Sequence, residues 1–201
     1  MKKKKLIVIS ILVALFLFIT GIVVADKTAV FDNKIYSLVR LLDSNFFDNY
    51  FIFITKFGNP IVVVTIVLIL ILLFRNNDGL LLGFVAANSA LTNQLLKYII
   101  KRERPLVVKL IEQGGYSYPS GHAMISLSIY GFLLYLVFKK INNKFIKYSI
   151  GGLLLILILS VGVSRIYLGV HYASDIIGGY LLALIELILI IEFFNKRFRG
   201  N

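Results

Sequence analysis

Long apolar runs recur along this chain and constrain its fold more than any other feature of the sequence. A helix needs about 17–25 apolar residues to cross about 30 Å of hydrocarbon. Each run is near that length once the polar ends of the two shortest are included. The runs cover roughly Leu6–Ala25, Phe51–Phe74, Leu80–Ile100, Ala123–Phe138, Tyr148–Val163 and Ile176–Phe194. The sequence therefore predicts an all-α protein: an integral membrane bundle of six transmembrane helices, forming one domain over residues 1–201.

The first apolar run has two interpretations, because four lysines (Lys2–Lys5) precede it, as basic residues precede the core of a signal peptide. Val23-Val24-Ala25 weakly resembles a cleavage site. A signal core spans only about 7–15 residues, whereas this run has about 20. We therefore expect an uncleaved first helix. Cysteine is absent, which excludes disulfides and thiolate metal sites and leaves the redox compartment open.

The net charge of +12 would indicate nucleic-acid binding in a soluble protein. Here the basic residues lie at the ends of the apolar runs, where they report orientation, since cytoplasmic loops carry an excess of Lys and Arg. If six helices alternate, twelve of the 22 cations fall on one side: Lys2–Lys5, Arg75, Lys139, Lys140, Lys144, Lys147, Lys196, Arg197 and Arg199. We expect a multi-pass protein of the cell membrane with both termini in the cytoplasm and no nucleic-acid partner.

The segment Asp26–Tyr50 is too polar to span a membrane. Its apolar residues recur at helical spacing with charged residues between them, a pattern typical of an amphipathic helix on a membrane surface. These apolar positions are Phe31, Ile35, Leu38, Val39, Leu42 and Phe46. We predict an interfacial helix after the first crossing, acting either as a linker or as a guide for substrate. Further on, Gly58-Asn59-Pro60 should bend or restart the second crossing, because proline lacks an amide proton.

Three motifs rich in phosphate-binding residue types stand at the ends of the predicted helices. The first is Lys97-x6-Arg104-Pro105. Lys97, Lys101 and Arg104 lie at i, i+4 and i+7, so we predict that they share one face at the end of the third helix and that Pro105 stops this helix. Cations at a helix end can also lie among lipid headgroups without any further role. That is the interpretation we give to Lys101 and Arg102.

The second motif, Pro119-Ser120-Gly121-His122, opens the fourth apolar run. Serine is a preferred helix N-cap, and the free amides at the start of a helix bind anions. A phosphate there would accept hydrogen bonds from the Gly121 and His122 amides and from the Ser120 hydroxyl, and glycine allows a close approach to the backbone. His122 would then reach a departing oxygen. The alternative is a histidine at the membrane interface without a chemical role.

The third motif is Ser164-Arg165-x5-His171-x3-Asp175. One helical turn between His171 and Asp175 would bring imidazole and carboxylate together. A carboxylate bound to one ring nitrogen fixes the tautomer and leaves the other nitrogen free to attack. Arg165 offers a planar fork that matches phosphate. An Arg165–Asp175 pair that only closes the loop is the alternative.

All three motifs fall on the same face of the predicted bundle, away from the termini. They fix eleven positions, and with a chance of about 1 in 20 at each, a coincidental match is negligible. No cluster of Asp, Glu or His has the spacing of metal ligands, so we expect neither a metal nor another cofactor. With both termini inside, the motifs would face outside.

The pattern resembles the type 2 phosphatidic acid phosphatase superfamily, which includes bacterial lipid phosphatases and shares its fold with vanadium haloperoxidases. The family motifs occur here without departure, and the resemblance covers essentially the whole chain. It implies a two-step displacement in which His171, oriented by Asp175, attacks phosphorus. His122 would protonate the leaving oxygen and then activate water. The residues implied to hold the phosphoryl oxygens are Lys97, Arg104, Ser120, Gly121 and Arg165.

The resemblance also implies a lipid phosphate or pyrophosphate as the substrate, taken from the bilayer, and it leaves protein partners unknown. Undecaprenyl pyrophosphate is the first choice, because outward-facing chemistry suits recycling of that carrier. Phosphatidylglycerophosphate and phosphatidic acid are the alternatives. A non-catalytic lipid-phosphate binder or transporter would be favoured only if His122, His171 or Asp175 were missing. A vanadate-dependent peroxidase is disfavoured, because the soluble peroxidases lack such an apolar composition.

Glu186 lies deep in the sixth apolar run. An ionisable residue inside a membrane is a functional hypothesis by default. Packing against a polar neighbour such as Asn88 or Asn93 is the interpretation we favour.

Overall fold

The computed structural model describes residues 3–74 and 77–198 of the chain. Within these residues all regular secondary structure is helical, which confirms the all-α prediction. In chain order the elements are α1 (Lys3–Val24), α2 (Ala29–Arg40), α3 (Asn45–Ile54), the 3-10 helix η1 (Thr55–Gly58), α4 (Pro60–Phe74), α5 (Asn77–Ile100), α6 (Gly121–Lys140), α7 (Lys144–Tyr167) and α8 (Ala173–Phe198).

By length and composition, the described helices are consistent with five membrane crossings, or six if one bent pair is counted as a single span. Helices α1, α5, α6, α7 and α8 are each long and apolar enough to cross a membrane. The predicted crossing Phe51–Phe74 is divided, because α3 with η1 meets α4 at a bend of 53°. The break lies at Gly58-Asn59-Pro60, as predicted: η1 ends at Gly58, and α4 begins at Pro60. Proline suits a first helical position, where its missing amide proton loses no helical bond.

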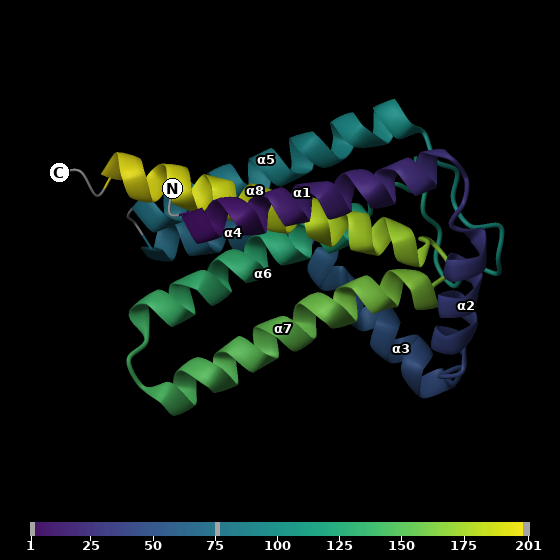
Figure 1. Cartoon of the computed structure of the whole chain (residues 1–201). Coiled ribbons are helices and arrows are strands. Elements are labelled where there is room, and N and C mark those ends of the chain that lie inside the picture. Colours follow the sequence, from purple (N-terminus) through teal and green to yellow (C-terminus); the bar gives the residue numbers. More distant parts are fainter. Residues whose placement is uncertain (1–2, 75–76, 199–201) are drawn as a thin grey trace.

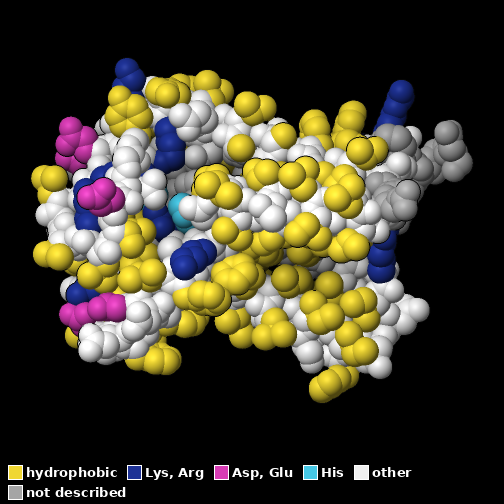
Figure 2. Space-filling model, turned by 180° about the vertical axis from the view of Figure 1, so that it is seen from behind, with side chains coloured by type: hydrophobic (Ala, Val, Ile, Leu, Met, Phe, Trp, Pro, Cys, Tyr) yellow, Lys and Arg dark blue, Asp and Glu magenta, His cyan; other side chains and the backbone are white. Residues whose placement is uncertain are grey.

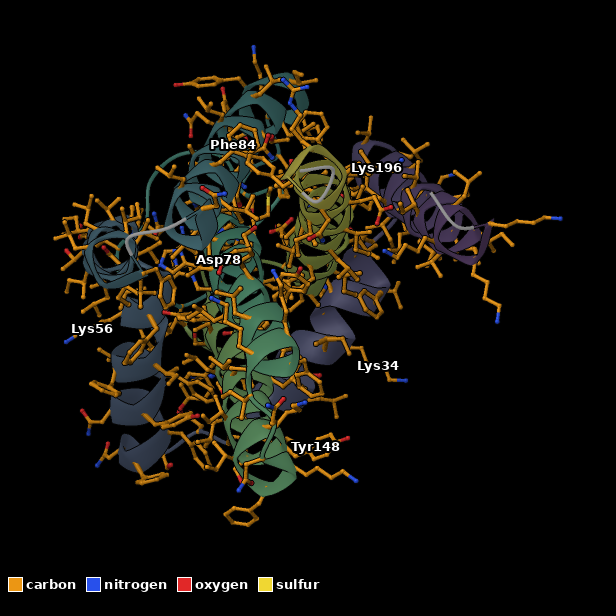
Figure 3. The ribbon with its side chains drawn as sticks, turned by 90° about the vertical axis from the view of Figure 1, so that its left-hand side faces the viewer. Lys34, Lys56, Asp78, Phe84, Tyr148 and Lys196 are labelled. Carbon is orange, nitrogen blue, oxygen red and sulfur yellow. The ribbon has the colours of Figure 1, made fainter. Side chains whose placement is uncertain are left out.

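The long helices run in one general direction, and α2 lies across one end of the bundle (Figure 1). The first and last described residues lie at the opposite end, together with the connection between α6 and α7. Figure 3 views the molecule from that opposite end; Lys34 and Lys56 point away from the bundle there, on opposite sides. The fold therefore has a termini end and an α2 end.

Basic residues mark the termini end, as the sequence predicts for one side of the membrane. Lys139 and Lys140 close α6, and Lys5 pairs with Glu192 at 2.6 Å, which joins α1 to α8. The predicted cations Lys2, Arg75 and Arg199 lie outside the described residues.

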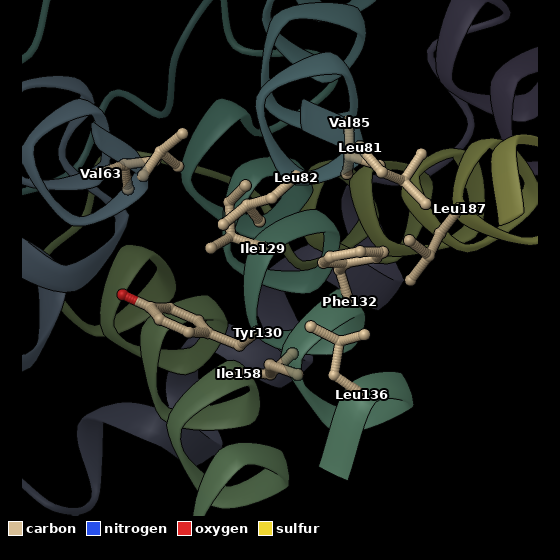
Figure 4. Close-up of a cluster of buried hydrophobic side chains, with 11 residues drawn as sticks. Val63, Leu81, Leu82, Val85, Ile129, Tyr130, Phe132, Leu136, Ile158 and Leu187 are labelled. Carbon is tan, nitrogen blue, oxygen red and sulfur yellow. The ribbon is translucent and has the colours of Figure 1, made fainter. Parts of the chain in front are cut away.

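The main core lies between five helices and is shown in Figure 4. Its buried side chains come from α4, α5, α6, α7 and α8: Val63, Val67, Leu81, Leu82, Val85, Ile129, Tyr130, Phe132, Leu136, Ile158 and Leu187. Leu82, Ile129 and Phe132 are fully buried. Because lipid tails are as apolar as these side chains, the bundle depends on close packing and polar contacts between helices more than on exclusion of water.

The polar segment Asp26–Tyr50 contains two helical stretches in place of the one interfacial helix predicted. Ser44 interrupts it: its backbone is extended, and its hydroxyl accepts a hydrogen bond from Phe47 N, so that it caps α3. In α2, Ile35 and Val39 pack against a buried cluster that includes residues of α8. The other predicted apolar positions, Phe31, Leu38, Leu42 and Phe46, are exposed.

Glu186 lies in α8 beside α5, where it interacts with Asn88 and Thr92. We expected Glu186 to pack against Asn88 or Asn93, and of these two it contacts Asn88. Asn93 instead donates a hydrogen bond to Pro119 O at 3.0 Å, which ties α5 to the start of α6.

Candidate active site

The three motifs meet at the α2 end of the bundle. The 101–120 connection, the first turn of α6 and the connection between α7 and α8 border one cavity of about 760 Å³. In Figure 2 a histidine side chain is visible at this end, close to Lys and Arg side chains and beside the apolar flank of the molecule. The motif residues that line the cavity are Lys97, Arg104, Gly121, His122 and His171.

His171 and Asp175 form a buried pair. His171 precedes α8, and Asp175 lies in its first turn. The two side chains meet at 3.2 Å between Nδ1 and Oδ2. The same carboxylate oxygen accepts the Tyr172 backbone amide at 2.9 Å and the hydroxyl of Ser117. The Asp175 side chain is therefore fixed by several donors and cannot rotate away from His171.

The environment of His171 keeps its imidazole neutral. Burial lowers its pKa to about 3, although the hydrogen bond and the charge of Asp175 act in the opposite direction. A neutral ring that donates its Nδ1 proton to Asp175 has its lone pair on Nε2. That nitrogen lies 3.1 Å from Nη1 of Arg104. The unprotonated ring nitrogen of His171 therefore accepts a hydrogen bond from a cation that lines the cavity.

Two cations of the first motif are held by backbone carbonyls of the 114–116 stretch. Arg104 Nη2 donates to Gly114 O at 2.8 Å, and its Nε donates to Gly115 O at 2.9 Å. Lys97 Nζ donates to Tyr116 O. Burial lowers the pKa of Arg104, and the charge of Asp175 opposes that shift. The backbone carbonyls therefore accept hydrogen bonds from Lys and Arg groups of the kind that bind phosphate oxygens.

Arg165 extends from α7 into the same region and is almost fully buried, with 1% of its surface exposed. Its Nη1 donates to Thr55 Oγ1 at 2.7 Å and its Nη2 to Gln113 Oε1 at 2.8 Å. Its Nε–H is buried without a hydrogen-bond partner. A buried cation whose partners are neutral side chains is costly, because desolvation of the charge is not offset by an opposite charge. An anion beside Arg165 would remove that cost.

The second motif folds as predicted, with Ser120 as the N-cap of α6. Its hydroxyl accepts a hydrogen bond from Ala123 N at 3.5 Å, and its side chain is buried behind the cavity wall. A Cβ on Gly121 would lie 2.9 Å from Asn93 Oδ1, so glycine lets α5 approach the start of α6 closely. His122 follows and lines the cavity. Both histidines of the chain therefore border one cavity, from different elements.

The prediction for the first motif is wrong in its local geometry. α5 ends at Ile100, and Lys101 has a positive φ of 52°, a conformation that commonly terminates helices. Lys101 and Arg104 therefore do not continue a helix face with Lys97. Lys101 is exposed, so its predicted position at the headgroups remains open.

The interpretation of Arg102 as a headgroup cation is also wrong. Its side chain is only 12% exposed, and Nη1 lies 2.6 Å from Asp175 Oδ1. The opposite charge and hydrogen bonds of Asp175 and Asp32 raise its pKa even though burial lowers it. Past the end of α5 the chain is not helical, and Arg102 contacts Asp175 while Arg104 contacts His171. Arg102 and Arg104 can therefore both point towards the third motif.

Sequence reasoning also missed Asp32 and Ser117. The sequence did contain an indication for Asp32. This residue lies three positions before Ile35 and seven before Val39, and therefore on the helix face that packs against the bundle. An acid on an apolar face indicates a buried partner. Ser117 carried none, because a serine in an irregular segment is ordinary.

Within residues 3–74 and 77–198 no three side chains of the types that bind metals gather in one place. The groups that do gather are cations, two histidines, a carboxylate and helix amides. Such an arrangement can bind the oxygens of a phosphoryl group, attack its phosphorus and supply a proton.

Comparisons with known proteins match these features. The family model described as the PAP2 superfamily matches residues 78–199. Phosphatidylglycerophosphatase B of Bacillus subtilis is 38% identical over 128 residues, which cover 61% of this chain and 62% of that relative, less than two thirds of its length. An undecaprenyl-diphosphatase of Sulfolobus acidocaldarius is 27% identical over 86% of this chain and 84% of its own. The crystal structure of a transmembrane PAP2 type phosphatidylglycerolphosphate phosphatase from Bacillus subtilis superposes with a TM-score of 0.84, at 27% identity, over 94% of this chain and 96% of that one.

Proposed function

This chain belongs to the PAP2 superfamily, and from that membership and the geometry of the cavity we propose that it is a lipid phosphatase of the membrane. It removes a phosphate from an amphiphilic substrate through a phosphohistidine at His171. The observation that carries the proposal is the position of the His171–Asp175 pair, whose unprotonated Nε2 borders the cavity and accepts a hydrogen bond from Arg104 Nη1 at 3.1 Å.

In the first step Nε2 of His171 attacks phosphorus while the bond from phosphorus to the leaving oxygen breaks. His122 gives that oxygen a proton, and Asp175 stabilises the imidazolium that forms on His171. In the second step His122 accepts a proton from water, whose oxygen bonds to phosphorus as the bond to His171 breaks. The products are inorganic phosphate and neutral His171.

Phosphate binding is assigned to Lys97, Arg104 and Arg165, with the Gly121 amide and the Ser120 hydroxyl at the start of α6. The buried, unpaired Nε–H of Arg165 supports this assignment, because a phosphoryl oxygen would complete its hydrogen bonding. Substrate would also replace the backbone carbonyls that hold Lys97 and Arg104. Such fixed donors and charges stabilise the charge that develops in the transition state.

The other half of the cavity supports an amphiphilic substrate. Between α4 and α5 it is lined by apolar residues, among them Val64, Leu68, Ile71, Ala87 and Ala90. Helix α5 is long and apolar enough to cross a membrane, and α4 belongs to the bent pair that meets the same criterion as a whole. A lipid tail would lie along these residues with its phosphate beside the histidines.

Undecaprenyl pyrophosphate remains the first-choice substrate, and phosphatidylglycerophosphate or phosphatidic acid the alternatives. Two of the relatives carry names that correspond to these substrates. We propose that both termini face the cytoplasm, that the site faces outside and that α2 lies at the outer membrane surface. A lipid-phosphate binder without activity is the alternative of another class, and the intact set of His122, His171 and Asp175 disfavours it.

Phosphate release by the purified full-length protein tests the proposal. Undecaprenyl pyrophosphate, phosphatidylglycerophosphate, phosphatidic acid and soluble nitrophenyl phosphate are supplied at equal concentration with excess EDTA. We expect release from at least one lipid, faster than from the soluble ester, and none from His171→Gln. Binding of the lipids without release from any of them would favour the non-catalytic alternative. Loss of activity in EDTA that magnesium restores would contradict the metal-independent mechanism.

A further inference from the structure

A single buried arginine joins two buried carboxylates beside the proposed nucleophile. Arg102 Nη1 lies 2.6 Å from Asp175 Oδ1, and its Nη2 lies 2.9 Å from Asp32 Oδ2. Both carboxylate side chains are fully buried. The guanidinium also lies over the Tyr172 ring at 4.0 Å. Asp32 lies in α2, a helix outside the three motifs. Arg102 therefore connects this helix to the carboxylate of Asp175.

Asp32 also holds the first turn of α8. Its Oδ1 accepts the backbone amide of Ser174 at 2.8 Å, and its Oδ2 accepts the Ser174 hydroxyl at 2.8 Å. Ser174 is next to Asp175 in that turn. A carboxylate at the N-terminus of a helix satisfies free amides and interacts favourably with the helix dipole. Asp32 therefore fixes both the backbone beside Asp175 and the arginine that binds its side chain.

The charges of this cluster suit the phosphohistidine state. Asp32, Arg102 and Asp175 together carry one net negative charge. When His171 becomes an imidazolium, that charge is neutralised. Without Asp32, Arg102 alone would neutralise Asp175, and the carboxylate would stabilise the imidazolium less. Buried charges interact more strongly than charges in water, so this balance affects the reaction.

We propose that Asp32 and Arg102 are positioning residues for the phosphoryl transfer. Arg102 binds one oxygen of Asp175 so that the other stays on His171 Nδ1, and Asp32 orients Arg102 and balances its charge. The inference rests on the proposed function, since it concerns the same histidine. It adds two residues that the family motifs do not specify: Arg102, at an open position within the first motif, and Asp32 on α2.

The exposed pair Arg40–Asp43 supplies a matched control. Like the pair of Arg102 and Asp32, it joins an arginine to an acid: Arg40, the last residue of α2, lies 2.8 Å from Asp43. The Arg40 guanidinium lies over a tyrosine ring, as that of Arg102 does. Asp43 is 58% exposed, and exposed ion pairs contribute little. Asp43→Asn therefore removes the same charge as Asp32→Asn without touching the His171–Asp175 pair.

The test measures kcat, KM and the rate of phosphohistidine formation by rapid quench, with the thermal midpoint of each variant. Loss of a residue that hydrogen-bonds to a metal ligand without contacting the metal typically costs about 10–100-fold in affinity or activity. We use this range for a residue that supports Asp175 in the same way. We expect Arg102→Gln to lower kcat and phosphohistidine formation by about that factor with little change in KM, and Arg102→Lys to recover part of the loss. Asp32→Asn, whose amide oxygen can still accept the Ser174 amide, should also lower kcat. It should add little in the Arg102→Gln background, because the amide keeps the contact with the Ser174 backbone and the contact that it loses is the one with Arg102. Asp43→Asn should match the wild type.

Wild-type kcat per folded molecule in Arg102→Gln would overturn the inference, whatever happens to the thermal midpoint. Additive losses in the double variant would overturn the coupling between Asp32 and Arg102. Absence of phosphate release by the wild type would contradict the proposed function itself, so the two failures are distinguishable.

Discussion

Nε2 of His171 lies 3.1 Å from Nη1 of Arg104, while Nδ1 of the same ring lies 3.2 Å from Asp175. The imidazole is thus held between a carboxylate behind it and a cation in the cavity. A phosphate bound by Arg104 would lie next to the Nε2 lone pair that we propose as the nucleophile. This relationship separates the roles of the two histidines and leads to the first prediction.

Replacement of each histidine should have a different effect. His171→Ala should abolish both turnover and the acid-quenched phosphoenzyme, because His171 is the histidine that pairs with a carboxylate. His122→Ala should lose about 10²–10⁴ in rate with lipid monophosphates, the usual contribution of a general acid, and less with a nitrophenyl ester, whose leaving group needs no proton. Phosphoenzyme labelled on His122 would contradict these roles.

Asp175→Asn should keep the fold and the affinity for phosphate but lose turnover by up to about 10⁴-fold. The amide can hold the wrong tautomer of His171 and cannot stabilise an imidazolium. Vanadate affinity, measured by inhibition in wild type and by direct binding in the variant, reports whether the phosphate site is intact. Near-full activity of Asp175→Asn would exclude the proposed role.

Because the pKa of His171 is lowered, part of the free energy of unfolding should depend on pH. It is lowered by burial to about 3 in the folded protein, whereas an unperturbed histidine titrates near 6.5. Between these values the unfolded state binds a proton that the folded state does not, so stability is lost as pH falls from about 6.5 towards 3. Each pKa unit corresponds to about 1.4 kcal/mol. As pH falls from 7 to 4, the thermal midpoint of the wild type should fall relative to that of His171→Gln. A constant difference would contradict the shift.

Gly58 provides a test of the position of His122. A Cβ at residue 58 would lie 2.9 Å from His122 Cδ2 and 2.9 Å from Val161 Cγ1. Gly58→Ala should therefore displace the imidazole and lower kcat, with a smaller effect on nitrophenyl phosphate than on a lipid monophosphate. Gly152→Ala is the control, because nothing lies within 4 Å of the added Cβ. Equal activity of the two variants would show that His122 can move without loss.

Orientation can be tested with single cysteines, since the natural chain has none. Asn142 lies in the α6–α7 connection at the termini end, and Glu112 lies in the 101–120 connection; both are exposed. In intact cells an impermeant thiol reagent should label Glu112→Cys and not Asn142→Cys. The reverse result would turn the site towards the cytoplasm and favour a substrate of the inner leaflet.

The sequence by itself determined the helical class, most of the membrane crossings, the break at Pro60 and the motif residues that line the cavity. These features depend on local properties: the length of apolar runs, the missing amide proton of proline, the N-cap at Ser120 and the four-residue spacing of His171 and Asp175. Apolar length could not decide whether the bent α3–α4 pair counts as a crossing, because a 53° bend depends on packing around it.

Only the tertiary structure decided what the cations contact. Arg102 lies 70 residues from Asp32 and 73 from Asp175 along the chain, and nothing in its neighbourhood distinguishes it from a lysine or arginine among lipid headgroups. The end of α5 at Ile100 turns it towards the third motif, and α2 supplies the second carboxylate. For one and the same local sequence, a charged side chain at a helix end can contact either lipid headgroups or buried groups of the protein. The choice depends on whether an opposite charge from a distant segment is buried beside it, because only such a partner offsets the desolvation of the charge.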